Sequence, residues 1–232
     1  MLRVEEINTF YGEAHTLFDV SLEIREAEVV ALLGRNGAGK TTTIRSIMGL
    51  TPPQTGRILF KEENIAGLPP YAIANRGVGF VPDNRRIFPN LTVRRNLEIA
   101  RKGNGGKDGW TLEKIYEHFP KLKEIQSRPG EVLSGGEQQM LTIARTLMGN
   151  PDLVLLDEPT EGLAPIMVTE VMKIVRELKE KGETILLVEQ NSTLALSVSQ
   201  RAYILENGRE VFSGLAEELI QNMELRQRYL GV

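Results

Sequence analysis

The chain has 232 residues, of which 41% are hydrophobic and 25% are charged, a composition typical of a folded globular protein that excludes disordered and fibrous classes. Its 28 basic residues against 31 acidic ones give a net charge of −3, so no basic excess indicates a nucleic-acid partner. Cysteine does not occur in the sequence, which excludes disulfides, thiolate catalysis and thiolate metal sites.

The first third of the chain predicts short strands separated by turns. Strand-like segments are "LRVEEIN" at residues 2–8, "FDVSLEI" at 18–24 and "EVVALLG" at 28–34. The last is a nearly continuous apolar run, as expected for a strand that is buried on both faces of a sheet. A helical segment follows Lys40, and "GRILFKEENI" and "GVGFVP" predict further strands.

The pattern becomes helical between residues 91 and 149, with a glycine-rich interruption at residues 102–109. Beyond Pro151, the strands "LVLLD", "TILLV" and "RAYILENG" alternate with helical segments, and "REVFSG" predicts a final hairpin arm. Such alternation predicts an α/β fold with a mainly parallel sheet. We expect a single domain over residues 1–232, with an α/β core at 1–84 and 151–232 and a helical insertion at 85–150.

The apolar segments are too short for a membrane protein. No run reaches the roughly 18 to 20 residues needed to span a bilayer, and the first ten residues lack the apolar core of a signal peptide. We therefore expect a cytoplasmic location.

The segment "GRNGAGKT" at residues 34–41 lies between a buried strand and a helix and fits the phosphate-binding pattern G-x-x-x-x-G-K-[ST]. Glycines let backbone N–H groups converge on phosphate oxygens, and the positive end of the following helix points at the same anion. We expect Lys40 to reach the β- and γ-phosphates and the Thr41 hydroxyl to bind Mg²⁺. The alternative is a glycine-rich turn that happens to precede a lysine and a threonine. The predicted nucleotide-binding residues here are Gly34, Arg35, Asn36, Gly37, Ala38, Gly39, Lys40, Thr41 and Thr42.

Two acidic residues follow the apolar strand "LVLLD". Asp157 at the strand's carboxyl end suits a direct or second-sphere Mg²⁺ ligand, and Glu158 is placed to accept a proton from an attacking water. The alternative is a pair of charges at the start of a helix, for which Pro159 would be suitable.

The segment "LSGGEQQ" at residues 133–139 predicts a helix start. Ser134 is a suitable cap, and two glycines after it would let an anion approach the helix N-terminus closely. At this point the chain resembles the ATP-binding cassette (ABC) family, whose signature is LSGG[QE]. The resemblance covers essentially the whole chain, because the phosphate loop, the signature and the acidic strand occur in the family's order and spacing.

The resemblance implies an ABC ATPase fold, with an antiparallel β part at the N-terminus and a helical subdomain that carries the signature. It implies that Tyr11 stacks on adenine and that two cassettes pack head to tail. ATP would then lie between the phosphate loop of one subunit and the signature of the other, Ser134, Gly135, Gly136 and Glu137.

The segments "FVPDNRRIFPNLTV", "LSGGEQQML", "DEPTEGLAP" and "LLVEQN" resemble the LivF type of ATPase subunit in branched-chain amino acid importers. This implies ATP and Mg²⁺ as cofactors, a second ATPase subunit in a homo- or heterodimer, and a place at the cytoplasmic face of the membrane. It also implies permease subunits that contact residues 85–93, for which packing against the helical insertion is the alternative. Importers of urea or short amides remain open, as do a soluble cassette protein acting on ribosomes or DNA and a binding module without turnover.

Three positions depart from the family pattern. Asp83 replaces the usual glutamine after "GVGFVP", so a carboxylate would face Mg²⁺ and water, and Ala164 replaces the usual aspartate before a proline. Gln190 stands where the family has a histidine that contacts the γ-phosphate. Its amide can bridge phosphate and water but does not titrate near neutrality, so we expect Glu158 to be the base and Gln190 a positioning group. The alternative for Gln190 is an amide that caps the following helix.

Overall fold

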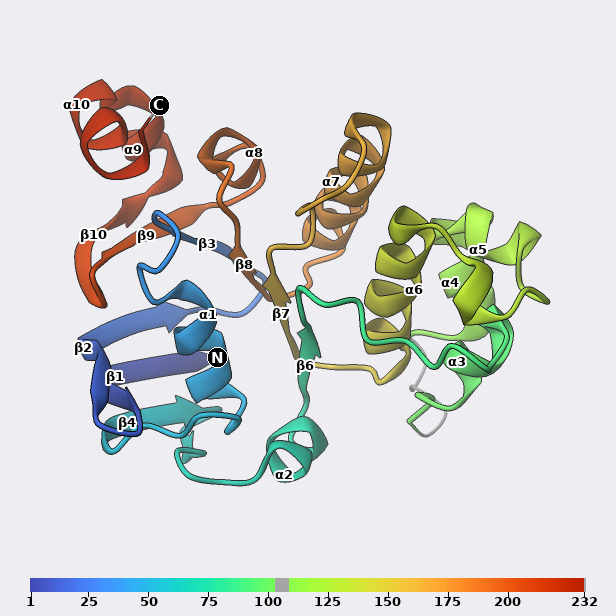
Figure 1. Cartoon of the computed structure of the whole chain (residues 1–232), viewed down its shortest axis with the longest axis horizontal. Helices are drawn as coiled ribbons and strands as arrows, with labels where there is room; N and C mark the ends of the chain where they lie inside the picture. The colour runs from blue at the N-terminus through green and yellow to red at the C-terminus, as the bar shows by residue number, and fades with distance from the viewer. Residues whose placement is uncertain (103–108, 232) are drawn as a thin grey trace.

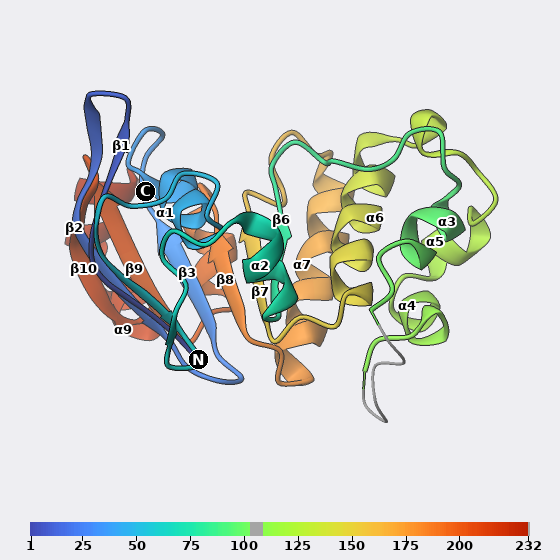
Figure 2. The ribbon, with the colours of Figure 1, turned by 90° about the horizontal axis from the view of Figure 1, so that it is seen from below.

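The structure of the protein is a computed structural model that describes residues 1–102 and 109–231. Most of the predicted glycine-rich interruption, residues 103–108, lies outside the described residues. The strands form two sheets, and a block of helices lies at the opposite end of the molecule from the N-terminal sheet (Figures 1 and 2).

The N-terminal sheet is antiparallel and has the order β2-β1-β4-β5. Its strands are β1 (Leu2–Tyr11), β2 (Ala14–Ile24), β4 (Thr55–Phe60) and β5 (Glu63–Asn64). Apolar side chains recur on one face, for example Leu2, Val4 and Ile7 of β1, all of which are buried. This alternation is typical of a sheet with one face on a core.

The six-stranded sheet has the order β10-β9-β3-β8-β7-β6. Its strands are β3 (Val29–Leu33), β6 (Val78–Val81), β7 (Leu153–Asp157), β8 (Ile185–Val188), β9 (Arg201–Glu206) and β10 (Arg209–Leu215). All pairings are parallel except that between β9 and β10. Every residue of β3, β7 and β8 is buried. The prediction of a mainly parallel sheet, taken from the alternation of strands and helices, is confirmed.

Helices pack against the six-stranded sheet, and a further group of helices lies past its β6 edge (Figure 1). Those of the α/β part are α1 (Lys40–Ile47), α2 (Pro70–Asn75), α7 (Pro165–Glu180), α8 (Ser192–Leu196), α9 (Ala216–Gln221) and α10 (Met223–Leu225), with a π-helical turn at Arg226–Leu230. Between β6 and β7 lie α3 (Val93–Glu98), α4 (Leu112–His118), α5 (Pro120–Glu124), a 3-10 turn (Gly130–Val132) and α6 (Gly135–Met148). No helix in the described ranges is long and apolar enough to cross a bilayer.

Two hydrophobic cores lie on opposite faces of the six-stranded sheet. Val30 and Leu32 of β3 face the core shared with α1 and the antiparallel sheet, whereas Val29, Ala31 and Leu33 face the core shared with α6 and α7. This rigid sheet fixes where its strands end. β3, β8 and β7 are neighbours in parallel register, so the loops that follow them emerge side by side at one edge.

Candidate active site

The phosphate loop connects β3 to α1 through a backbone that requires glycine. Gly34 has φ 145°, and a Cβ there would lie 2.4 Å from the Leu205 carbonyl oxygen. Gly39 has φ 108°, and a Cβ there would lie 2.6 Å from the Leu17 side chain. α1 begins directly after Gly39 without a side-chain cap, so the amides of its first turn are available to an anion.

Lys40 lies inside this loop with only 4% of its surface exposed. Its ammonium donates hydrogen bonds to the carbonyl oxygens of Gly34 at 2.9 Å and Arg35 at 3.3 Å. It also lies 3.3 Å from Oε1 of Glu158. The positive charge is therefore buried at the centre of the loop and paired with the carboxylate that the sequence indicates as the base.

Thr41 and Asp157 meet across the edge of the sheet. The Thr41 hydroxyl donates to Asp157 Oδ1 at 3.2 Å, and Asp157 is 1% exposed. Burial raises the pKa of Asp157 to about 6, the Thr41 hydrogen bond opposes this shift, and the charges of Asp83 and Glu158 add to it. A hydroxyl beside a desolvated carboxylate is a donor set that suits Mg²⁺. In the part of the chain that the structure describes, this site included, no group of three or more His, Asp or Glu side chains is placed to hold a metal.

Glu158 and Gln190 form a direct contact between the ends of β7 and β8. Gln190 Nε2 donates to Glu158 Oε2 at 2.8 Å, and Glu158 N donates to Val188 O at 2.9 Å. Glu158 has φ 46°, in the left-handed region that side chains seldom adopt. Oε1 of the carboxylate thus faces Lys40, and Oε2 faces Gln190.

The sequence left two alternatives open: that Gln190 caps the following helix, and that Asp157 and Glu158 are charges at the start of a helix. Both are wrong. Helix α8 is capped by Asn191, whose side chain accepts from Leu194 N at 3.1 Å, so Gln190 is not the cap. No helix begins at Pro159, because α7 begins at Pro165.

A hollow of about 360 Å³ joins these groups. It is lined by Thr16, Asn36, Gly37, Gly39, Lys40, Thr41, Thr42, Glu158, Glu161 and Gln190. Thr16 and Glu161 were not predicted from the sequence. Glu161 lies three residues beyond Glu158, and a hydrogen bond and the negative charge from Glu158 raise its pKa. Thr16 comes from β2, and its place depends on how the two sheets pack.

Other predicted residues lie outside this hollow. Asp83 lines a neighbouring hollow of about 350 Å³ together with Thr41 and Asp157, and Arg35 and Ala38 line another of about 270 Å³. Tyr11, at the end of β1, is 45% exposed.

The signature segment also lies outside the hollow and starts α6. The Ser134 hydroxyl accepts from Glu137 N at 3.3 Å, and Glu137 Oε2 accepts from Ser134 N at 2.8 Å, so the predicted cap is a capping box. The two glycines do not leave open space: a Cβ at Gly136 would lie 2.5 Å from the Met167 side chain, and one at Gly135 would lie 2.7 Å from Arg85 Nη1.

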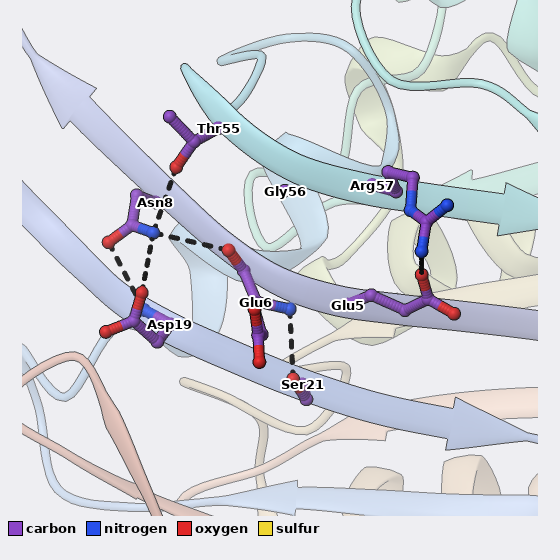
Figure 3. Close-up of a pocket in the computed structure, with 8 residues that line it drawn as sticks. All are labelled: Glu5, Glu6, Asn8, Asp19, Ser21, Thr55, Gly56 and Arg57. Atoms are coloured by element: carbon purple, nitrogen blue, oxygen red, sulfur yellow. Dashed lines mark hydrogen bonds and ion pairs between the residues drawn. The ribbon is translucent and has the colours of Figure 1, made fainter.

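A larger hollow, of about 560 Å³, lies on the antiparallel sheet away from the phosphate loop. Figure 3 shows that its wall is formed by β1, β2 and β4, with Asp19 hydrogen-bonded to Asn8 and with Arg57 paired to Glu5. Its wall carries three carboxylates, those of Glu5, Glu6 and Asp19, against the single Arg57. Such a surface repels phosphate, so this hollow is not the nucleotide site.

Comparison with known proteins decides the family. The ABC transporter family matches residues 17–161, across the phosphate loop, the signature and the acidic strand. The chain belongs to the ABC transporter family. Membership makes the protein an ATPase subunit of a transporter.

Similar proteins include several transport ATPases. The branched-chain amino acid transport ATP-binding protein BraG of Pseudomonas aeruginosa is 42% identical over the whole of both chains. A probable LivF of Archaeoglobus fulgidus is 37% identical over all of this chain and 99% of its own length. The lipopolysaccharide export ATP-binding protein LptB of Haemophilus influenzae is 36% identical over all of this chain and 97% of its own.

Solved ABC cassettes share the fold. The ADP conformation of MJ1267 superposes with a TM-score of 0.83 at 29% identity, covering all of this chain and 97% of that one. A dimeric post-hydrolysis state of MJ0796 with ADP and Pi has a TM-score of 0.78 at 26% identity, covering 93% of this chain and 99% of that one.

Proposed function

We propose that the protein energises the import of branched-chain amino acids. The observation that carries this proposal is the 42% identity to BraG over the whole of both chains. The LivF-like segments of the sequence support the same solute class.

We further propose that ATP is bound between two cassettes packed head to tail. The amides of Gly135 and Gly136 precede the first hydrogen bond within α6, which Gln138 N donates to Ser134 O, so they are available to an anion. The signature lies outside its own subunit's hollow, and a dimeric state is known for MJ0796. The partner is a second copy or a paralogous ATPase subunit.

Within each site the residues have separable roles. Lys40 binds the terminal phosphates, and in doing so exchanges its contact with Glu158 for phosphate oxygens. Thr41 and Asp157 would hold Mg²⁺, and Asp83 lies near them. The ion would neutralise part of the phosphate charge. Glu158 accepts the proton of the attacking water. The Gln190 amide holds Glu158 in place.

Docking of the permease is proposed on residues 85–93. Phe88 is 47% exposed, whereas Ile87 packs against the core beside α6. The Phe88 ring is therefore available to a partner, and the packing of Ile87 holds this segment on the core. Docking there would place the protein at the cytoplasmic face of the membrane as a peripheral subunit.

The test is reconstitution of the protein with its copurifying membrane subunits and solute-binding protein in proteoliposomes. We expect ATP-dependent uptake of radiolabelled leucine, isoleucine or valine, abolished by Glu158→Gln. Uptake of urea or a short amide in place of these amino acids would refute the proposed solute.

A lipopolysaccharide exporter is the second candidate, because LptB of Haemophilus influenzae is 36% identical over all of this chain. The same reconstituted complex distinguishes the two. Release of lipopolysaccharide from the vesicles, with no leucine uptake, would favour the exporter.

A further inference from the structure

The loop after β6 makes an unpredicted contact with the ATP site. We propose that Arg85 is a positioning residue for ATP hydrolysis, whose guanidinium holds the loop after β7, residues 158–164, against the start of α6. The proposal rests on the ATPase activity of the family and does not depend on the solute or the docking surface proposed above.

The contacts of the guanidinium carry this inference. Arg85 Nη2 donates to the Glu161 carbonyl oxygen at 2.6 Å, a short bond of the charge-assisted kind. Nη1 occupies the space where a Cβ on Gly135 would lie, at 2.7 Å, and Nη2 is 3.5 Å from the position of a Cβ on Gly162. One side chain therefore fills the gap between the signature and the loop that carries Glu158.

Contacts around Arg85 fix its backbone conformation and, with it, the direction of its side chain. Arg85 has φ 45°, a conformation that persists in non-glycine residues only where surrounding contacts impose it. Those contacts are present on the following residues. Arg145 of α6 donates to the Arg86 carbonyl oxygen, and the Asn96 side chain bonds both the N–H and the carbonyl of Phe88 at 2.9 and 3.0 Å.

The loop after β7 is held from two sides. On one side Glu189 Oε1 accepts from the Thr160 amide at 3.1 Å and from its hydroxyl at 2.8 Å. On the other side Arg85 binds the carbonyl of Glu161, the residue whose own amide donates to the Glu158 carbonyl at 3.1 Å. Removal of Arg85 would leave the turn that begins at Glu158 anchored on one side only.

The first experiment measures ATP hydrolysis by the assembled transporter with Arg85→Ala, Arg85→Lys and the control Arg76→Ala, which alters an arginine that follows α2. We expect Arg85→Ala to lower kcat about tenfold, the effect of losing a charged hydrogen bond, with KM for ATP nearly unchanged. Arg85→Lys should recover part of the loss because its ammonium can reach the same carbonyl. The Arg76 guanidinium also donates to a backbone carbonyl oxygen, that of Ala72 at 3.2 Å, but it lies outside the ATP site and the proposed docking segment. Arg76→Ala should therefore leave kcat near wild type. A raised KM with unchanged kcat in Arg85→Ala would overturn the proposal.

The second experiment is a double-mutant cycle with Gly135→Ala. A methyl group at Gly135 must displace the guanidinium, so its cost in kcat should be several-fold smaller in an Arg85→Ala background. In an Arg76→Ala background, the fold-losses in kcat caused by Gly135→Ala and by Arg76→Ala should multiply. If the fold-losses in kcat of Gly135→Ala and Arg85→Ala also multiply in the double variant, Arg85 does not occupy that space.

A third measurement needs no turnover and uses the purified chain alone. Amide hydrogen exchange of residues 160–164 should accelerate in Arg85→Ala and remain slow in Arg76→Ala, while exchange in α1 stays unchanged. If Arg85→Ala does not fold, Arg85→Lys serves in the cycle, since it lacks the second nitrogen beside Gly135. Unchanged exchange at residues 160–164 in a folded variant would contradict the proposal.

Discussion

The contact between Gln190 and Glu158 gives the most direct test of the hydrolytic site. Each oxygen of the Glu158 carboxylate faces one donor: Lys40 Nζ lies 3.3 Å from Oε1, and Gln190 Nε2 donates to Oε2 at 2.8 Å. Gln190→Ala removes the second donor without touching the phosphate loop. A hydrogen bond to a charged group contributes about 1.5–3 kcal/mol, and the exposed position of Gln190 argues for the lower end. About 1.4 kcal/mol corresponds to a tenfold change in rate.

The assay is steady-state ATP hydrolysis by the assembled transporter, with kcat and KM determined separately. We expect Gln190→Ala to lower kcat by about an order of magnitude with little change in KM. Gln190→His should retain much of the activity, because an imidazole N–H can donate to the same oxygen. Gln190→Glu should be worse than alanine, since it places a second carboxylate beside Glu158. Gln221→Ala, which alters an exposed amide on α9, is the matched control.

Full turnover by Gln190→Ala would refute this reasoning. So would a selective loss of ATP affinity, because it would place Gln190 in binding and not in the positioning of the base. The wild-type rate should also lack a histidine-like step near pH 6 to 7 from this position, about the range in which an imidazole titrates. Gln190→His should therefore add a step in this range that the wild-type profile lacks.

Three further predictions follow from the described contacts. Lys40→Ala should abolish most Mg·ATP binding in a fluorescent-nucleotide titration while circular dichroism shows an intact fold; wild-type affinity would contradict the phosphate-loop assignment. Glu158→Gln should keep ATP binding, lose turnover and accumulate a nucleotide-bound dimer in gel filtration; a normal rate would mean that another group is the base. Burial raises the pKa of Glu183, whose carboxylate accepts from Trp110 Nε1 at 2.8 Å. The stability of wild type relative to Glu183→Gln should therefore fall as pH rises from about 4, where an unfolded glutamate titrates; a constant difference in Tm between pH 4 and 7 would contradict this.

Much of the fold could be predicted because its central strands are apolar on both faces. β3, β7 and β8 appear in the sequence as short apolar runs that end at Gly34, Asp157 and Glu189. Parallel strands align their carboxyl ends, which is enough to bring the phosphate loop, the acidic pair and Gln190 to one edge. The division at residues 84/85 and 150/151 stays a prediction, as do the adenine contact of Tyr11 and the cross-subunit role of the signature.

Of the two site residues that the sequence did not predict, Thr16 depends on the packing of the two sheets and Glu161 on how a loop turns. Glu161 reaches the hollow because the chain turns sharply after Glu158, which adopts φ 46°. Nothing in the local composition indicates that conformation, since glutamate seldom adopts it. From the sequence, the glycines of the signature were explained by the room that they leave for an anion. The structure shows a second reason for glycine at these positions, because the side chains of Arg85 and Met167 approach them closely.

Hydrogen bonds made by side chains join the loops after β6, β7 and β8, which are far apart in the sequence. Gln190 holds the carboxylate of Glu158, Glu189 holds Thr160, and Arg85 holds the carbonyl of Glu161. Of the three holding residues, only Arg85 belongs to the segment proposed to meet the permease. A partner that contacts Phe88 would move the loop of Arg85, whose guanidinium binds the carbonyl oxygen of Glu161 in the loop that also carries Glu158. Docking and hydrolysis would then be coupled by direct contact through a single side chain. Arg85→Ala should accordingly weaken the stimulation of ATPase activity by the permease more than it weakens assembly of the complex.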